Sequence, residues 1–258
     1  MRPTFTLRLR AALRSAAALS MISALALTFG PAASASAHTP DPRSVVFARD
    51  AQPYGLPMAT WGQLISQWIY AQPFDMNPAY DQTGADCAID QHGPAWFIPP
   101  IFAPPGTHHP IIQNASRTCT VPAHRGMLLD IGSIVDEFPC PDPSFTPPPG
   151  ESLYDFLIAD AKPVMDSVNE LDVSVDGTAV PDVLSYRYHS AQLFEIKGDL
   201  SLQAVLDGCI TGTFQPAIID GFFLMVKPLQ PGVHTIVVHG TNTIGDDRTY
   251  TYHLTVAR

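Results

Sequence analysis

The sequence predicts a mainly β protein, an antiparallel β-sandwich of Ig-like or jelly-roll-like type with two accessory helices and a long, Pro-rich, disulfide-pinned loop region. Three observations predict this class. Apolar and polar residues alternate over many short stretches of the second half of the chain. Turn-forming residues separate those stretches at short intervals. Four cysteines follow a segment that is typical of an export signal.

Residues 1–37 are typical of a Sec-type signal peptide. Four arginines precede an apolar segment over 16–27, and Ala35-Ser36-Ala37 supplies small residues for cleavage after Ala37. The absence of a twin-arginine pair favours the general secretory route. We therefore expect a secreted or periplasmic protein with no transmembrane segment in the mature chain.

The mature chain is predicted to be acidic. The four signal arginines would leave on cleavage, so that 10 Lys+Arg of the original 14 face 24 Asp+Glu, a net charge of −14. Such a charge disfavours nucleic acid as a partner, since proteins that bind it carry basic patches. We expect an arm or linker over 38–56 and a single sandwich-type domain over 57–258. Its first part, 57–168, would hold a helix and Pro-rich loops, and 169–258 would be its strand-rich half.

The first half of this domain contains two predicted helices. Thr60 and Gln63 resemble a capping box, and the helix would end before Pro73. Its apolar stripe consists of Trp61, Leu64, Ile65, Trp68 and Ile69. A second helix should begin at Ser152 and be kinked or restarted by Pro163. Between the helices, residues 94–149 hold 13 of the 26 prolines, which predicts irregular structure around one strand at 125–131.

The second half of the domain is predicted to be strands. Alternation over 171–175 ends at an Asp176-Gly177 turn. Further strands are expected at 183–189, 192–197, 200–206, 218–227, 233–239 and 249–257. Matching the apolar faces of the last two strands places Val237 opposite Tyr250 and His234 opposite His253. Such a histidine pair could join a transition-metal site or respond to pH, although two half-exposed sheet positions explain the same residues.

The cysteines are expected to form two disulfides, because their number is even and the compartment expected for an exported protein is oxidising. Three pairings are possible, and we favour Cys87–Cys119 and Cys140–Cys209. No C-x-x-C spacing is present, which argues against a structural zinc or a thioredoxin-type site.

Residues 77–97 concentrate turn formers and acids ahead of the aromatic Trp96. Asp81, Asp86 and Asp90 could offer oxygen ligands to Ca²⁺, although their spacing fits no EF-hand and Asx turns explain the same residues. Two of these aspartates could also serve as the carboxylate pair of a glycosidase, a reading that depends on their separation.

His38 is a further candidate metal ligand, because cleavage after Ala37 would make it the mature N-terminus. Its amine and ring could then bind copper with a second histidine. In this one feature it is similar to the histidine brace of the copper-dependent polysaccharide monooxygenases. The alternative is an ordinary residue that follows a cleavage site.

Three stretches of this chain resemble a group of uncharacterised exported bacterial proteins. They are W-G-Q-L-I-S-Q-W-I-Y with N-P-x-x-D-x-T-G-x-x-C-x-x-x-Q-x-G-P-x-W-F over 61–97, R-x-C-x-V-P at 117–122, and D-G-F-F-L-M-V-K-P-L-Q-P-G-V-H-T-I at 220–236. The resemblance implies a secreted globular protein and no particular activity.

The sequence carries no familiar catalytic motif. Ser133 stands in D-I-G-S-I-V rather than G-x-S-x-G, and no H-E-x-x-H, P-loop or Rossmann fingerprint is present. We therefore expect a non-catalytic binding protein or an envelope or extracellular structural protein. It would need no cofactor, and its partner would be an extracellular ligand or an envelope component. The alternative is a secreted hydrolase or a Ca- or Cu-dependent enzyme acting on an extracellular polymer.

Overall fold

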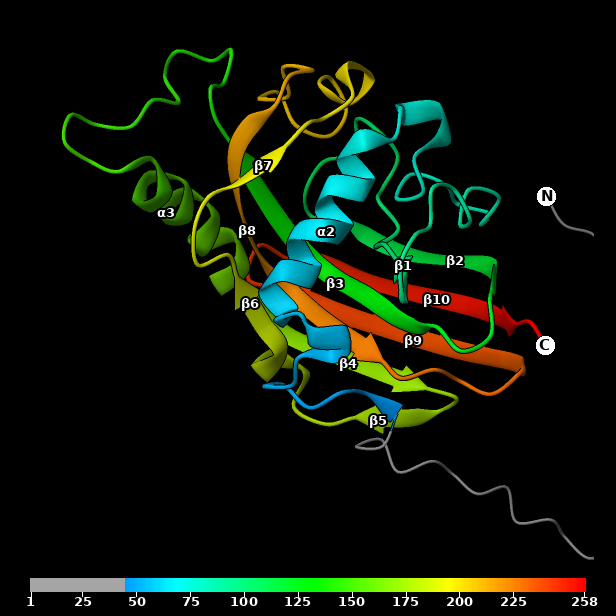
Figure 1. Ribbon diagram of the computed structural model, residues 1–258. Helices are drawn as coiled ribbons and strands as arrows, with labels where there is room; N and C mark the ends of the chain where they lie inside the picture. The colour runs from blue at the N-terminus through cyan, green and yellow to red at the C-terminus, as the bar shows by residue number, and fades with distance from the viewer. Residues whose placement is uncertain (1–44) are drawn as a thin grey trace, which may run out of the picture. The chain divides into compact units, whose positions relative to one another are not determined.

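Two five-stranded β-sheets pack face to face in the computed structural model, which describes residues 45–258 (Figure 1). The expected signal peptide and His38 lie outside the described residues. Sheet A has the order β1-β3-β8-β6, with β7 also paired to β8, and sheet B the order β2-β10-β9-β4-β5. The strands of sheet A are β1 (Ala95–Ile98), β3 (Gly126–Glu137), β6 (Arg187–His189), β7 (Phe194–Ile196) and β8 (Gln215–Val226). Those of sheet B are β2 (Ile112–Val121), β4 (Val168–Val175), β5 (Thr178–Val180), β9 (Gly232–Asn242) and β10 (Asp247–Val256).

The mainly β class is confirmed, but the expectation of purely antiparallel sheets is wrong. β1 pairs with β3 in parallel, and β2 pairs with β10 in parallel over its whole length. Both strands arise from the Pro-rich stretch in which only 125–131 was expected to be a strand. All four residues of β1 are buried, so it shows no alternation. The inward face of β2 includes the charged residue Arg117. This residue interrupts the alternation of apolar and polar residues by which a strand is recognised in a sequence.

Among residues 45–258, two α-helices accompany the sheets, as expected. Helix α2 (Met58–Ala71) crosses the outer face of sheet A (Figure 1). It begins after Pro57 with no side-chain cap, so the predicted capping box does not form. Helix α3 (Leu153–Asp166) begins after Ser152, whose Oγ accepts a hydrogen bond from the Asp155 N–H, and it continues through Pro163.

Most predicted strands are present, with two differences in kind. The segment expected as a strand over 200–206 instead starts with a 3₁₀ helix (Leu200–Leu202), because the Asp199 carboxylate accepts the Ser201 N–H and favours a turn. A 3₁₀ helix (Val183–Tyr186) also precedes the short β6. Two further 3₁₀ helices span Pro53–Gly55 and Phe74–Met76. The Asp176-Gly177 turn joins β4 to β5 as predicted, and both residues have positive φ.

The predicted register between β9 and β10 is wrong by one residue. Val237 lies opposite Thr251, so His253 faces Thr235 and His234 faces Leu254. The two histidines therefore point to opposite faces of sheet B. Both faces of β9 carry apolar residues, so matching apolar faces did not identify the buried one and gave the wrong register. Ile236 and Val238 are the buried set, whereas Val233 is 79% exposed.

In the described part of the chain, three apolar clusters hold the fold together: one between the sheets, one between sheet A and α2, and a small one under α3. The described part of the predicted arm differs from expectation. Val45 and Val46 are buried in the core between the sheets, and Val46 bridges to Val226. Between residues 45 and 258, no helix combines the length and apolar character needed to cross a bilayer.

The two disulfides have the pairing expected from the sequence. Cys87–Cys119 joins the 77–97 segment to β2, with a Cα separation of 5.8 Å. Cys140–Cys209 joins the segment after β3 to the loop before β8, with a Cα separation of 4.2 Å. Two disulfides in one domain indicate an oxidising compartment such as the cell exterior or the periplasm.

Candidate functional site

The carboxylate of Asp81 organises the turn that follows it. Its Oδ1 accepts the Thr83 N–H and hydroxyl at 2.7 Å, and its Oδ2 accepts the N–H groups of Gly84 at 2.8 Å and Asp86 at 2.9 Å. Burial alone would raise the pKa of Asp81, but these hydrogen bonds outweigh it and lower the pKa. Asp81 thus closes an Asx-type turn, the structural alternative considered above.

The other two aspartates of this segment do not converge with Asp81 on a common point. Burial, together with the charges of Asp81 and Asp75, raises the pKa of Asp86. Asp90 is exposed and has a positive φ of 43°. Across residues 45–258 these three aspartates do not form a group of close ligand atoms.

Three other polar side chains bond to the backbone of this segment. The Asn77 side chain donates to the Ile69 carbonyl at 2.8 Å and accepts the Ala79 N–H at 3.0 Å, which ties the end of α2 to the segment. The Gln91 amide bonds to both the N–H and the carbonyl of Phe97. The buried Arg117 of β2 donates to the Pro78 carbonyl. These hydrogen bonds therefore hold residues 77–97 in place as a structural segment.

His234 and His253 occupy different environments. The His234 ring pairs with the Asp176 carboxylate at 2.8 Å and with the Gln230 carbonyl at 2.8 Å, at the end of the sheet. His253 is exposed on the outer face of sheet B. The structure thus does not bring these two candidates together.

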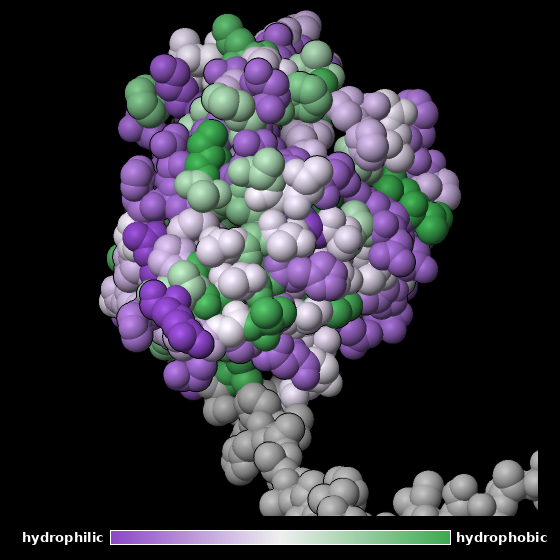
Figure 2. All heavy atoms as spheres, turned by 90° about the vertical axis from the view of Figure 1, so that its right-hand side faces the viewer, coloured by the Kyte–Doolittle hydropathy of each residue, from purple (hydrophilic) through white to green (hydrophobic). Residues whose placement is uncertain are grey.

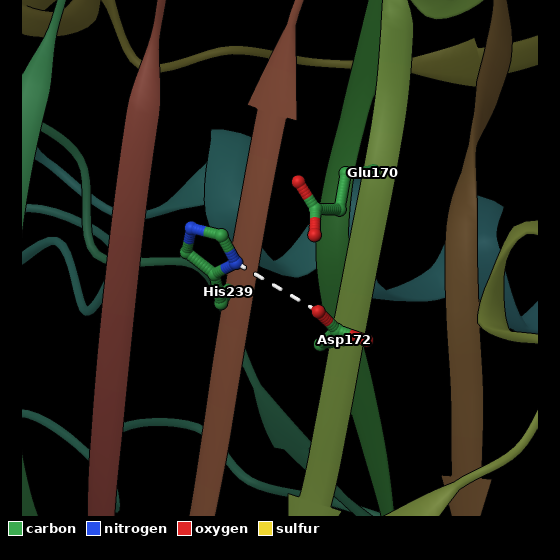
Figure 3. Close-up of side chains that lie close together, drawn as sticks. All are labelled: Glu170, Asp172 and His239. Carbon is green, nitrogen blue, oxygen red and sulfur yellow. Dashed lines mark ion pairs between the residues drawn. The ribbon is translucent and has the colours of Figure 1, made fainter.

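A different set of side chains gathers on the outer face of sheet B. Glu170 and Asp172 of β4 and His239 of β9 place one ligand atom each within 4.8 Å of one another (Figure 3). The His239 Nδ1 lies 3.9 Å from Asp172 and its Nε2 lies 3.0 Å from Asp247. Glu170 and Asp172 are solvent-exposed and His239 is already paired, so we interpret this group as a surface charge cluster.

A cavity lies between the two sheets. A cavity of about 560 Å³ opens at the end of the sandwich where α3 and the β9–β10 turn meet. We call it the inter-sheet cavity. Its walls are mainly apolar and come from Ile131 and Phe222 of sheet A, Leu171 and Val238 of sheet B, and Met165 of α3. Proteins hold small molecules in mainly apolar cavities of this size.

The wall of the inter-sheet cavity includes a backbone irregularity in β3. The register of β3 against β8 shifts between Asp130 and Gly132, as in a β-bulge. A Cβ on Gly132 would meet no heavy atom within 4 Å, so open space lies beside this residue. Glycine at this position therefore leaves room where another residue would carry a side chain.

Two exposed apolar side chains also line this cavity. Val164 of α3 is 50% exposed and Ile244 of the β9–β10 turn is 55% exposed. Elsewhere, the face of the protein in Figure 2 shows hydrophobic residues interspersed with polar ones. Exposed apolar side chains at a cavity suit the entry of an apolar molecule.

The charged groups at the inter-sheet cavity are engaged with one another. The Asp246 carboxylate accepts the Ile111 N–H at 2.7 Å, pairs with the His109 ring at 2.7 Å and accepts from Arg248 at 2.7 Å. Burial would raise the pKa of Asp246, but these bonds lower it to about 2. This network fastens the 109–111 segment to the turn.

A smaller cavity, which we call the acidic cavity, lies between α2 and β3. It measures about 250 Å³, and Asp130, Asp136 and Asp207 line it together with Tyr70. Burial raises the pKa of Asp130 to about 7, and burial with the charges of Asp160 and Asp207 raises that of Asp136 to about 7. Sequence reasoning missed this site, although an aspartate within the apolar stretch M-L-L-D-I was a usable signal.

No family model and no curated protein matches this chain. Among solved structures, the solution structure of amebosin aligns with 57% of this chain and 98% of that chain, at 13% identity. The TM-score of that alignment is 0.19, which is too low to carry a conclusion about fold or function.

Proposed function

We propose that this protein is an exported, non-catalytic binding protein that holds a small, largely apolar molecule in the inter-sheet cavity. The observation that carries the proposal is the cavity itself, about 560 Å³ in volume, with apolar walls and exposed apolar side chains at Val164 and Ile244. The two disulfides and the resemblance to exported bacterial proteins support the location.

The polar groups around the cavity support binding rather than catalysis. The Ser133 hydroxyl donates to Asp130 at 2.9 Å, and no histidine is its hydrogen-bond partner within the described residues. An activated serine needs a base that accepts its proton. His109, the histidine that lines the cavity, pairs with Asp246 instead.

The proposal can be tested with the neutral apolar dye N-phenyl-1-naphthylamine, whose fluorescence rises on burial. We expect one dye molecule to bind per protein. Gly132→Leu should fill the open space beside β3 and weaken dye binding at least ~10-fold, the equivalent of about 1.4 kcal/mol. The φ of Gly132 lies outside the left-handed region, so leucine is compatible with its backbone.

Gly208→Leu is the matched control, because Gly208 also has open space around its Cβ position and does not line the cavity. It should bind the dye as the unmodified protein does. If Gly132→Leu binds the dye equally well, or if the unmodified protein binds none, the proposed function is wrong.

A further inference from the structure

The acidic cavity adjoins the inter-sheet cavity across a free edge of β3. β1 pairs only with residues 126–129 of β3, so within the described chain the edge beyond Leu129 has no strand beside it on that side. The inter-sheet cavity lies on the face of sheet A that meets sheet B, and the acidic cavity on the face covered by α2. Phe102 and Ser133 line both cavities. The two cavities therefore lie side by side.

The acidic cavity has acceptors that lack donors. Asp130 is 1% exposed, its Oδ2 accepts the Ser133 hydroxyl, and its Oδ1 has no hydrogen-bond partner. Asp136 is 9% exposed and its Oδ2 also has no partner. Among the described residues that line this cavity, none has a basic side chain. A buried acceptor without a partner is costly, and a ligand that only donates hydrogen bonds would remove that cost.

The walls around these carboxyls suit an organic cation better than a bare metal ion. Tyr70, Phe102 and Ile69 contribute aromatic and apolar surface to the cavity. Within residues 45–258, the one group of three His, Cys, Asp or Glu ligand atoms that lie within 4.8 Å of one another is on the outer face of sheet B. An ammonium group on an alkyl chain can bond to carboxyls that are further apart and can rest against aromatic rings.

We propose that the ligand of this protein is an amphipathic cation, with its apolar chain in the inter-sheet cavity and its ammonium group in the acidic cavity. This inference rests on the proposed function, since it assigns a chemical class to the molecule held between the sheets. Asp130 is the principal partner of the ammonium group, because Ser133 connects it to both cavities. Asp136 and Asp207 add negative charge around the same space.

Three probes with one chain length separate the contribution of charge from that of the chain: n-octylammonium, n-octanol and n-octanoate. Each is used to displace N-phenyl-1-naphthylamine from the unmodified protein at neutral pH. We expect n-octylammonium to displace the dye at a concentration at least ~10-fold lower than n-octanol, as hydrogen bonds to a charged partner allow. n-Octanoate should be the weakest of the three, because its carboxylate meets like charge.

Asp130→Asn is the decisive variant, because asparagine keeps the size of the side chain and removes its charge. It should abolish the advantage of n-octylammonium and leave the displacement by n-octanol unchanged. Asp136→Asn should reduce the same advantage and serves if the first variant does not fold. Asp172→Asn, on the outer face of sheet B, is the control and should behave as the unmodified protein.

The outcomes distinguish the two proposals. If n-octanol displaces the dye as well as n-octylammonium does, or if Asp130→Asn keeps the preference for the ammonium probe, the cationic ligand class is wrong and the proposed binding function stands. If the dye does not bind or its binding is insensitive to Gly132→Leu, the binding function itself fails.

Discussion

At the scale of single residues, the 77–97 segment shows how densely placed polar residues bond to the backbone of a loop. Asp81 closes a turn, Asn77 joins the segment to α2, and Gln91 pairs with the backbone of Phe97. Each acceptor that a cation would need from Asp81 already receives backbone donors. Asp81, one of the three acids that suggested a calcium site, thus serves the backbone of its loop.

Gly84 is the glycine of this segment with the least room for a side chain. Its φ is +98°, and a Cβ would lie 2.0 Å from the carbonyl oxygen of Thr118, next to the disulfide partner Cys119. We expect Gly84→Ala to lower the free energy of unfolding by ~4 kcal/mol, through strain and displacement of β2. Urea unfolding followed by tryptophan fluorescence measures it.

Gly93→Ala provides the control for the backbone strain alone. Gly93 also has a positive φ of +78°, but nothing lies within 4 Å of its Cβ position. Its substitution should cost only about 1–2 kcal/mol. If both variants lose the same free energy of unfolding, the close contact between the new Cβ and Thr118 does not destabilise the protein.

At the scale of elements, α2 acts through the aromatic residues on its buried face. Trp61 and Trp68 are 3% and 7% exposed, and both contact Phe97 of β1, with ring centroids 6.4 Å and 5.4 Å apart. The Trp68 Nε1–H donates to the Ile89 carbonyl at 2.9 Å. The helix therefore covers sheet A and also holds the 77–97 segment.

Trp68→Ala should lower the free energy of unfolding by about 3–5 kcal/mol, the usual loss for a buried large aromatic residue. Trp68→Phe keeps most of the buried ring and removes the hydrogen bond to Ile89, so its loss should be clearly smaller. Urea unfolding followed by circular dichroism compares the two. A small loss for Trp68→Ala would mean that the residue is not part of the core.

The hairpin of β9 and β10 depends on its turn as much as on its apolar pattern. The Asn242 Oδ1 accepts the N–H groups of Ile244 and Asp246, and the Gly245 N–H donates to the Asn242 carbonyl. This turn sets the register in which Ile236 faces Tyr252. The pattern of apolar residues also fits a register shifted by one residue, because Val233 and Val237 are apolar as well.

At the scale of the whole molecule, three buried carboxyls among residues 45–258 have at least one oxygen without a hydrogen-bond partner, which makes folding sensitive to pH. Glu137 of β3 is 1% exposed, and neither of its carboxyl oxygens has a hydrogen-bond partner. Burial, and then the charges of Asp207 and Asp136, raise its pKa to about 9. The folded protein therefore holds this proton at pH values where the unfolded chain releases it.

We expect the stability of the protein to fall as the pH rises from about 5 to 9, since the unfolded state then binds fewer protons than the folded state. The pKa of Glu137 rises from 4.5 to about 9 on folding, which sets this range. Glu137→Gln should be more stable than the unmodified protein at pH 8 and lose that advantage near pH 4. Urea unfolding across this pH range measures both.

The exposed Glu151→Gln is the control and should follow the unmodified protein at every pH. If Glu137→Gln shows the same pH dependence as the unmodified protein, Glu137 does not carry the proton assigned to it. The effect would then belong to Asp130 and Asp136, whose pKa values burial raises to about 7.

The sequence by itself determined the features that depend on local pattern. The apolar stripe of α2, the start of α3 at Ser152, the Asp176-Gly177 turn and the mainly β second half follow from periodicity and turn chemistry. The disulfide pairing also agrees with the expectation. The helix, turn and strand features depend only on residues that are neighbours in the sequence. The disulfide prediction required only a choice among three possible pairings.

The tertiary structure alone decided the partners of those elements and the spaces between them. Periodicity shows which side of a strand is buried, but it does not show which strand lies beside it or in which direction. β1 and β2 were therefore not predicted, and the predicted β9–β10 register was wrong by one residue. The inter-sheet cavity arises where the β3 bulge, α3 and the two sheets meet, and the acidic cavity where β3 meets α2. Residues that converge from distant parts of a chain leave no local pattern.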